Sequence, residues 1–235
     1  MKIKIRKAAE RGVAEHGWLH ARFSFSFAGY YDPAHCGFHA LQVMNNDRIE
    51  PQSGFPMHPH QNAEIFTYIL SGQLEHKDSM GNGSIIQKGE LQYMSAGSGI
   101  YHSETNPSTK ESTELYQIWM KPSEEGGEPR YAEKKCNEQN FRNRLQLLFS
   151  EDGKEESTPI RQKAEFYIGH LSPGEKLSIE PQSCFPHGWV QIVQGGLSLD
   201  GQFLSKADGL AFENQNRCLL LSAREETQFF FFRLS

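Results

Sequence analysis

The sequence predicts an all-β fold that is built as two barrels in tandem. Through residue 120, apolar and polar residues alternate in short bursts, and no long helical period interrupts them. Turn-forming residues separate these bursts. Residues 49–56, Ile-Glu-Pro-Gln-Ser-Gly-Phe-Pro, recur almost unchanged as residues 179–186, Ile-Glu-Pro-Gln-Ser-Cys-Phe-Pro. Such an internal echo predicts two copies of one barrel.

The predicted strands of the first half follow one another closely. Phe23, Phe25 and Phe27 share one strand face, and with Trp119 they are interpreted as barrel core. In the second half, residues 229–232 are all phenylalanine, which predicts a buried last strand. In chain order we expect strands at 23–27, 64–70, 73–76, 84–87, 91–94, 100–104 and 115–120, with turns at 29–33, 71–72, 78–83, 88–90 and 97–99.

A connector is predicted between the two barrels. Residues 121–130 contain two prolines and two glycines among charged side chains, a composition typical of an exposed link. We therefore expect an N-terminal barrel at residues 1–125, a linker at 126–139 and a C-terminal barrel at 140–235. The charged stretch 151–163 is expected to be a surface loop.

Charge and composition exclude several classes of partner. The formal net charge of -5 and the pI of about 6.1 provide no broad cationic surface for nucleic acid or anionic lipid. The first residues are charged and no apolar run follows them, so a cytoplasmic location is expected. The four cysteines form no C-x-x-C pair, which favours reduced thiols without a catalytic role.

Four side chains form a candidate metal site. Residues i and i+2 of a strand point to the same face, so His58 converges with His60, and His102 converges with Glu104. Three imidazoles and one carboxylate suit iron(II), nickel, copper, zinc or manganese. Four protein donors leave a metal that prefers five or six ligands open to substrate, which indicates a catalytic metal.

Three other residues bear on this site. Glu64 is in phase with His58 and His60 and is a rival carboxylate, or else an acceptor that holds an imidazole N–H. His76 is interpreted as a solvated turn histidine. In the second copy, matching of the turns puts Leu220 and Ser222 where His102 and Glu104 stand, so no metal is expected there.

Several motifs resemble the pirins. They are Gly54-Phe55-Pro56-Met57-His58-Pro59-His60, residues 74–82 (Leu-Glu-His-Lys-Asp-Ser-Met-Gly-Asn) and residues 95–104 (Ser-Ala-Gly-Ser-Gly-Ile-Tyr-His-Ser-Glu). The opening, residues 16–19 and 25–33, is similar to bacterial pirins with quercetin 2,3-dioxygenase activity. The resemblance implies a bicupin, two tandem cupin (double-stranded β-helix, jelly-roll) barrels. It also implies that His58, His60, His102 and Glu104 bind one divalent transition metal, with iron placed first, in the N-terminal barrel.

The predicted function is a metal-dependent dioxygenase that cleaves flavonols such as quercetin, or a related enol or catechol, with dioxygen. Glu104 is then both ligand and catalytic proton acceptor. The alternative is a redox-responsive regulatory module that binds a protein partner without turnover, and a metal-dependent isomerase is a third hypothesis. A substrate-sized cavity over the metal would favour the enzyme. The chain is expected to act as a monomer.

Overall fold

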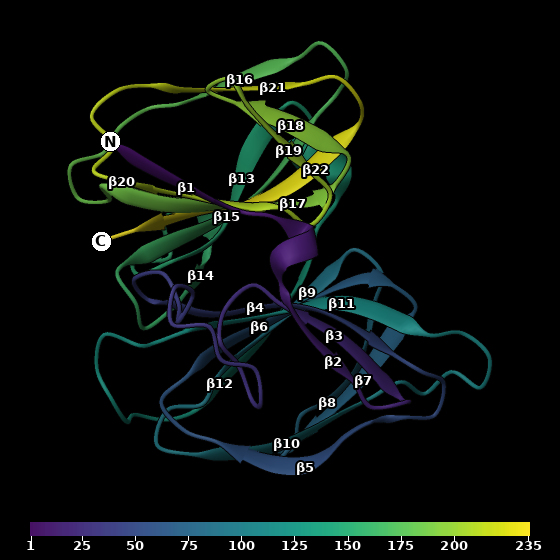
Figure 1. Cartoon of the computed structure of the whole chain (residues 1–235). Coiled ribbons are helices and arrows are strands. Elements are labelled where there is room, and N and C mark those ends of the chain that lie inside the picture. The colour runs from purple at the N-terminus through teal and green to yellow at the C-terminus, as the bar shows by residue number, and fades with distance from the viewer. The chain divides into compact units, whose positions relative to one another are not determined.

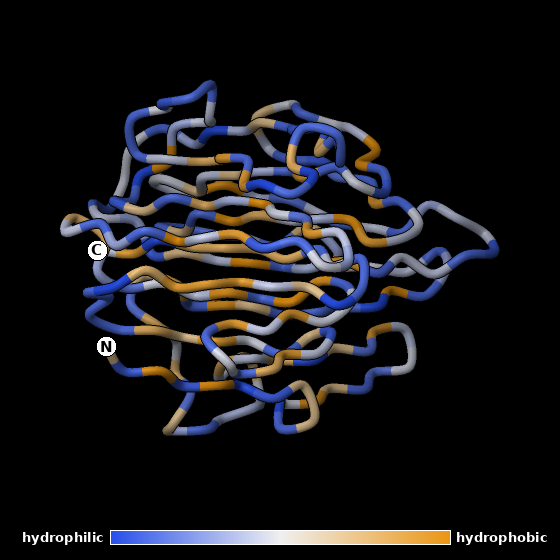
Figure 2. Tube along the Cα trace, turned by 90° about the horizontal axis from the view of Figure 1, so that it is seen from above, coloured by the Kyte–Doolittle hydropathy of each residue, from blue (hydrophilic) through white to orange (hydrophobic).

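The computed structural model describes all 235 residues, and it confirms the all-β, two-barrel prediction (Figure 1). One compact unit, here called the first barrel, spans Gly12–Cys136. The other, the second barrel, combines Met1–Arg11 with Asn137–Ser235. Hydrophobic residues concentrate along the strands and hydrophilic residues in the connecting loops (Figure 2). None of the helices combines the length and the apolar character that a membrane-spanning helix needs.

The first barrel consists of a seven-stranded and a four-stranded antiparallel sheet. The strand orders are β12-β9-β6-β11-β4-β3-β2 and β5-β10-β7-β8. The strand predicted at 23–27 is wrong in position: β3 ends at Phe23, and the long strand β4 was not predicted. The strands are β2 (Gly12–Glu15), β3 (Leu19–Phe23), β4 (Leu41–Ile49), β5 (Gly54–His60), β6 (Glu64–Ser71), β7 (Gln73–Asp78), β8 (Gly83–Gln87), β9 (Glu90–Ser95), β10 (Ile100–Thr105), β11 (Thr113–Met120) and β12 (Arg130–Lys135).

The second barrel repeats most of this topology, but its edge strand β14 is parallel to β13, whereas β2 is antiparallel to β3. Its sheets have the orders β1-β20-β17-β22-β15-β13-β14 and β16-β21-β18-β19. Its strands are β1 (Lys2–Arg6), β13 (Arg144–Ser150), β14 (Thr158–Pro159), β15 (Ala164–Leu171), β16 (Lys176–Ile179), β17 (His187–Gln194), β18 (Gly196–Leu199), β19 (Gln202–Ser205), β20 (Gly209–Glu213), β21 (Leu219–Ala223) and β22 (Thr227–Leu234). Its short helices are η1 (Ala8–Glu10), α1 (Glu138–Phe141) and η2 (Lys154–Glu156).

The internal echo in the sequence marks different places in the two barrels. Residues 49–56 lead from β4 into β5, whereas residues 179–186 lead from β16 into β17. Strand β16 is the counterpart of β5, because β16 pairs with β21 as β5 pairs with β10. The echo is thus displaced by one strand, since its turn residues suit either connection. The shared strand order is what shows the duplication.

The barrel boundaries differ from the predicted ones at both ends of the first barrel. Strand β1 pairs with β20 from Lys2↔Glu213 to Arg6↔Gly209, so the N-terminus belongs to the second barrel. Strand β12 pairs with β9 and completes the first barrel. The composition of residues 126–139 signalled exposure, which an edge strand shares with a linker, whereas pairing depends on distant residues.

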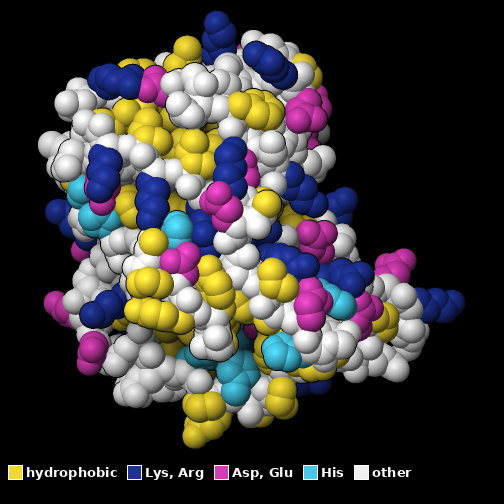
Figure 3. Space-filling view, in the orientation of Figure 1, with side chains coloured by type: hydrophobic (Ala, Val, Ile, Leu, Met, Phe, Trp, Pro, Cys, Tyr) yellow, Lys and Arg dark blue, Asp and Glu magenta, His cyan; other side chains and the backbone are white.

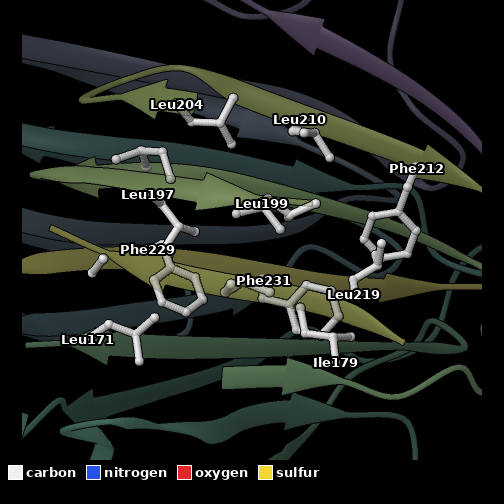
Figure 4. Packing of buried hydrophobic residues seen from close by; sticks show 14 residues of the cluster. Leu171, Ile179, Leu197, Leu199, Leu204, Leu210, Phe212, Leu219, Phe229 and Phe231 are labelled. Atoms are coloured by element: carbon white, nitrogen blue, oxygen red, sulfur yellow. The ribbon is translucent and has the colours of Figure 1, made fainter. Parts of the chain in front are cut away.

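The interior of the second barrel is filled by aliphatic and aromatic side chains (Figure 4). Phe229 to Phe232 are all fully buried, which confirms the predicted last strand. The proposed equivalence of Leu220 and Ser222 with the metal pair is wrong in register, because Leu220 is 45 % exposed while its neighbours Leu219 and Leu221 are buried. The inward positions of β21 therefore carry hydrocarbon side chains.

Truncation of one of these phenylalanines should destabilise the second barrel. Phe231 stacks with Tyr167 at 5.6 Å and with Phe212 at 6.2 Å between ring centroids. We expect Phe231→Ala to lower the free energy of unfolding of this barrel by about 3–5 kcal/mol, because a large cavity remains. Phe203→Ala is the matched control, since Phe203 is 50 % exposed. Equal losses in both variants, measured by calorimetry, would contradict the packing argument.

Candidate metal centre

Three histidines converge on two neighbouring strands, β5 and β10, of the four-stranded sheet of the first barrel. His58 and His60 lie on β5, and His102 lies directly opposite His58 on β10. The ring centroids are 4.5 Å apart for His58 and His102 and 4.8 Å apart for the other two pairs. One nitrogen from each ring lies within 4.8 Å of the others. The structure thus brings the three predicted histidines together.

Local backbone features accompany the pairing of β5 with β10 that places His58 opposite His102. The pairing of β5 and β10 shifts by one residue between His102 and Glu104, which is a β-bulge. At the start of β5, a Cβ atom on Gly54 would lie 2.2 Å from the backbone oxygen of Glu104. Glycine is therefore required there for the two strands to approach closely.

The state of the imidazoles fits a cation. Burial, followed by the charges of neighbouring histidines, lowers the pKa of His102 to about 2, and burial with the charge of His58 lowers that of His60 to about 4. Both rings are therefore neutral near pH 7 and can each donate a lone pair. His102 is buried, yet neither of its ring nitrogens has a hydrogen-bond partner. Such an orphaned pair of nitrogens fits a metal ligand.

His58 presents one defined nitrogen to the cluster. Its Nδ1 lies 2.8 Å from the backbone oxygen of Pro56, so the ring donates that N–H to the carbonyl. The Nε2 atom then carries the lone pair. A backbone carbonyl on the far nitrogen is the usual way to fix the tautomer of a metal-binding histidine.

Glu104 lies beside His102 but belongs to a deeper group of donors. Thr67 Oγ1 donates to one carboxylate oxygen at 3.0 Å and Gln117 Nε2 donates to the other at 2.9 Å. Burial raises the pKa of Glu104 above its ordinary value. The donor atoms of Glu104, His102 and His76 lie within 4.8 Å of one another. His102 is thus shared by both groups, and Glu104 as a ligand stays a prediction.

Two interpretations of nearby residues change. The carboxylate of Glu64 accepts from Tyr93 Oη and Ser95 Oγ, and Glu64 lies outside both groups of donors. His76 is fully buried, which corrects its interpretation as a solvated turn residue. Its ring nitrogens lie 3.2 Å from Asp78 and 3.1 Å from Gln92 Nε2, and its ring is 5.3 Å from that of His102. Along β7, more buried and more exposed residues alternate, and His76 is at one of the buried positions. This alternation could have indicated from the sequence that His76 points inward.

A cavity of about 190 Å³ lies over the histidines. Phe27 and Trp119 line it and also pack against the hydrophobic core, so they are not core residues alone. Two buried polar atoms, Asn45 Oδ1 and Trp119 Nε1, have no hydrogen-bond partner in the protein. In Figure 3, histidine side chains gather beside hydrophobic ones in the lower half of the visible face. The cavity is lined by Phe27, Asn45, Asp47, Phe55, His58, His60, Glu104, Gln117 and Trp119.

Sequence reasoning missed Asn45, Thr67 and Gln117. Each is a polar residue on a strand of the seven-stranded sheet, and all three are buried. A buried polar side chain requires a partner, so the contrast with its neighbours was the available signal.

Loss of a hydrogen bond to Glu104 should weaken the centre. Gln117→Leu keeps the size of the side chain but removes the donor at 2.9 Å from Glu104. We expect a loss of about 10–100-fold in metal affinity or turnover, the usual effect of removing a partner of a ligand. Gln42→Leu, at an exposed position of β4, is the control. Nickel titration by calorimetry measures the difference, and equal affinities in the two variants would argue against this role of Gln117.

Comparison with known proteins places the chain in a family. Residues 4–120 match the family model Pirin, and residues 147–234 match the model of the quercetinase C-terminal cupin domain. Two cupin barrels, with a cluster of histidine and glutamate donors in the first, define a bicupin. The chain belongs to the pirin family.

Two relatives illustrate the match. The chain is 46 % identical over 209 residues to the quercetin 2,3-dioxygenase of Escherichia coli strain K12. The aligned segment covers 89 % of each chain. The crystal structure of YhhW from Escherichia coli has a TM-score of 0.95 and 41 % identity, and covers 100 % of this chain and 98 % of that one. A structure of bacterial pirin YhhW in complex with nickel(II) has a TM-score of 0.94.

Proposed function

We propose that this protein is a metal-dependent dioxygenase that cleaves flavonols such as quercetin, or a related enol or catechol, with dioxygen. The observation that carries the proposal is a cavity lined by His58 and His60, two of the three converging histidines. A regulatory module needs no such cavity, so its presence favours the enzyme. The relative named quercetin 2,3-dioxygenase supports the same reaction class.

The proposed metal is held by His58, His60, His102 and Glu104. These donors suit several first-row ions, and iron(II) is placed first because its reduced state reacts with dioxygen. The nickel complex of the pirin from Escherichia coli supports a divalent ion without fixing which one. When bound, such an ion supplies a Lewis acid that lowers the pKa of a coordinated hydroxyl group.

The side chains of the cavity have separate tasks in this proposal. Glu104, whose pKa burial raises, takes the proton of the substrate's enolic hydroxyl. Trp119 Nε1 and Asn45 Oδ1, which lack protein partners, donate to and accept from polar groups of the substrate. Phe27 and Phe55 contact the planar rings and exclude water. In the overall reaction dioxygen adds to the flavonol, which yields the ring-opened ester and carbon monoxide.

Oxygen uptake tests the proposal. Protein reconstituted separately with iron(II), copper(II), nickel(II) or zinc(II) is offered quercetin, and His58→Ala serves as the blank. We expect uptake that requires a redox-capable metal and is lost in the variant. Turnover that proceeds without dioxygen would support an isomerase instead. Stoichiometric metal without uptake would overturn the dioxygenase and favour the regulatory alternative.

A further inference from the structure

A second, larger cavity adjoins the metal cavity in the first barrel. It has a volume of about 630 Å³ and is here called the aryl groove. The groove and the metal cavity share three lining residues, Phe27, Asp47 and Phe55. The remaining lining residues come from β2, the turn between β2 and β3, β3 itself and the segment that follows β3, and they include Ala14, Glu15, Trp18, Phe23 and Tyr30.

The metal cavity is too small to enclose a flavonol by itself. Its volume of about 190 Å³ lies below the roughly 300–1,000 Å³ of sites that bury a ligand of several rings. A substrate that chelates the metal through one ring must therefore extend out of this cavity. Because the aryl groove shares part of its wall with the metal cavity, it is the space into which the rest of such a substrate would extend.

Two rows of aromatic rings join the groove to the histidines. In one row, Phe55 lies 5.1 Å from Trp18 and 6.2 Å from His58. The other row runs from Tyr30 through Phe23, Phe27 and Trp119 to His60, with successive centroid distances of 6.3, 5.5, 5.4 and 4.8 Å. These separations suit stacked and edge-to-face contacts, so the lining is suited to a flat aromatic ligand.

Two polar side chains of the groove, Glu15 and Tyr30, are engaged within the protein. Arg22 Nη1 donates to Glu15 at 2.6 Å, and Tyr30 Oη donates to Asp32 at 3.3 Å. The rings and alanines of the groove are thus left to contact a ligand. Asp47, only 4 % exposed, lines the junction and can accept a phenolic hydroxyl.

We propose that the aryl groove binds the pendant aromatic ring of a two-part substrate whose chelating ring lies in the metal cavity. The inference rests on the proposed function and narrows its substrate class. Single-ring enols and catechols fill only the metal cavity, whereas flavonols fill both spaces. The groove therefore selects substrates that carry a second aromatic ring.

Calorimetric binding to nickel-loaded protein tests the groove without turnover. The probes are the parent flavonol and the matching hydroxychromone that lacks the phenyl ring. Ala14→Trp fills the groove from β2. Ala132→Trp is the matched control, because Ala132 is also half-buried but lies on β12, at the opposite edge of the same sheet. Trp18→Leu, which shortens one aromatic row, is a second variant in case Ala14→Trp does not fold.

We expect Ala14→Trp to raise the Kd of the flavonol about tenfold or more and to change that of the hydroxychromone less than about twofold. The control should leave both values unchanged. Equal effects on the two probes, or no effect on either, would refute binding of the pendant ring in the aryl groove, even if quercetin is cleaved. If Ala14→Trp weakens binding of the flavonol alone and the protein takes up no oxygen, the binding role of the groove is established and the dioxygenase is refuted.

Discussion

His102→Ala should abolish metal binding and oxygen uptake together. His102 belongs to both groups of donor atoms, and its two ring nitrogens have no other partner. Loss of an indirect partner of a ligand already costs about 10–100-fold in affinity, so loss of a ligand should cost more. We expect the bound nickel, measured by elemental analysis after gel filtration, to fall from one ion per chain to background.

His187→Ala is the control for this result. His187 is a half-buried histidine at the start of β17 in the second barrel. Its replacement should change neither the nickel content nor the oxygen uptake. Circular dichroism shows whether His102→Ala has folded, and His60→Ala replaces it if it has not. A folded variant that keeps one nickel ion per chain would refute the proposed centre.

Glu104→Gln should reduce turnover far more than substrate binding. Glutamine keeps the size of the side chain but cannot take a proton at neutral pH. Proton transfer by a positioned side chain contributes about 10²–10⁴-fold to a rate, so a fall of that size in kcat is expected. The Kd of the flavonol should change only slightly, because Asn45, Trp119 and the aromatic walls remain.

Glu64→Gln separates the two carboxylates that the sequence left in competition. Glu64 is as buried as Glu104, but its carboxylate accepts from Tyr93 and Ser95. Its replacement should lower the melting temperature and leave kcat near that of the wild type. If instead Glu64→Gln removes turnover and Glu104→Gln does not, the carboxylate of the centre has been assigned to the wrong strand.

The sequence predicted the positions of strands correctly where a local pattern decides the structure. The strands from β6 to β11 run for five to eight residues, and turns that contain glycine separate those from β6 to β10, so their position follows from short-range preference. Strand β4 was missed because Asn45, Asn46 and Asp47 interrupt its apolar pattern. Those polar side chains are tolerated because two of them line the metal cavity. Function here overrides the usual pattern.

The sequence by itself determined the all-β fold and the common strand face of His58 and His60, whereas the shared strand order shows the duplication and the pairing of β5 with β10 brings His102 to them. Spacing of two along a strand is enough to put paired side chains on one face. Only the tertiary structure decided which barrel contains β1 and β12, that Glu64 accepts from Tyr93 and Ser95 rather than facing the histidines, and that His76 lies buried beside His102. Each of these depends on pairing or packing between residues far apart in the chain, which no local pattern encodes.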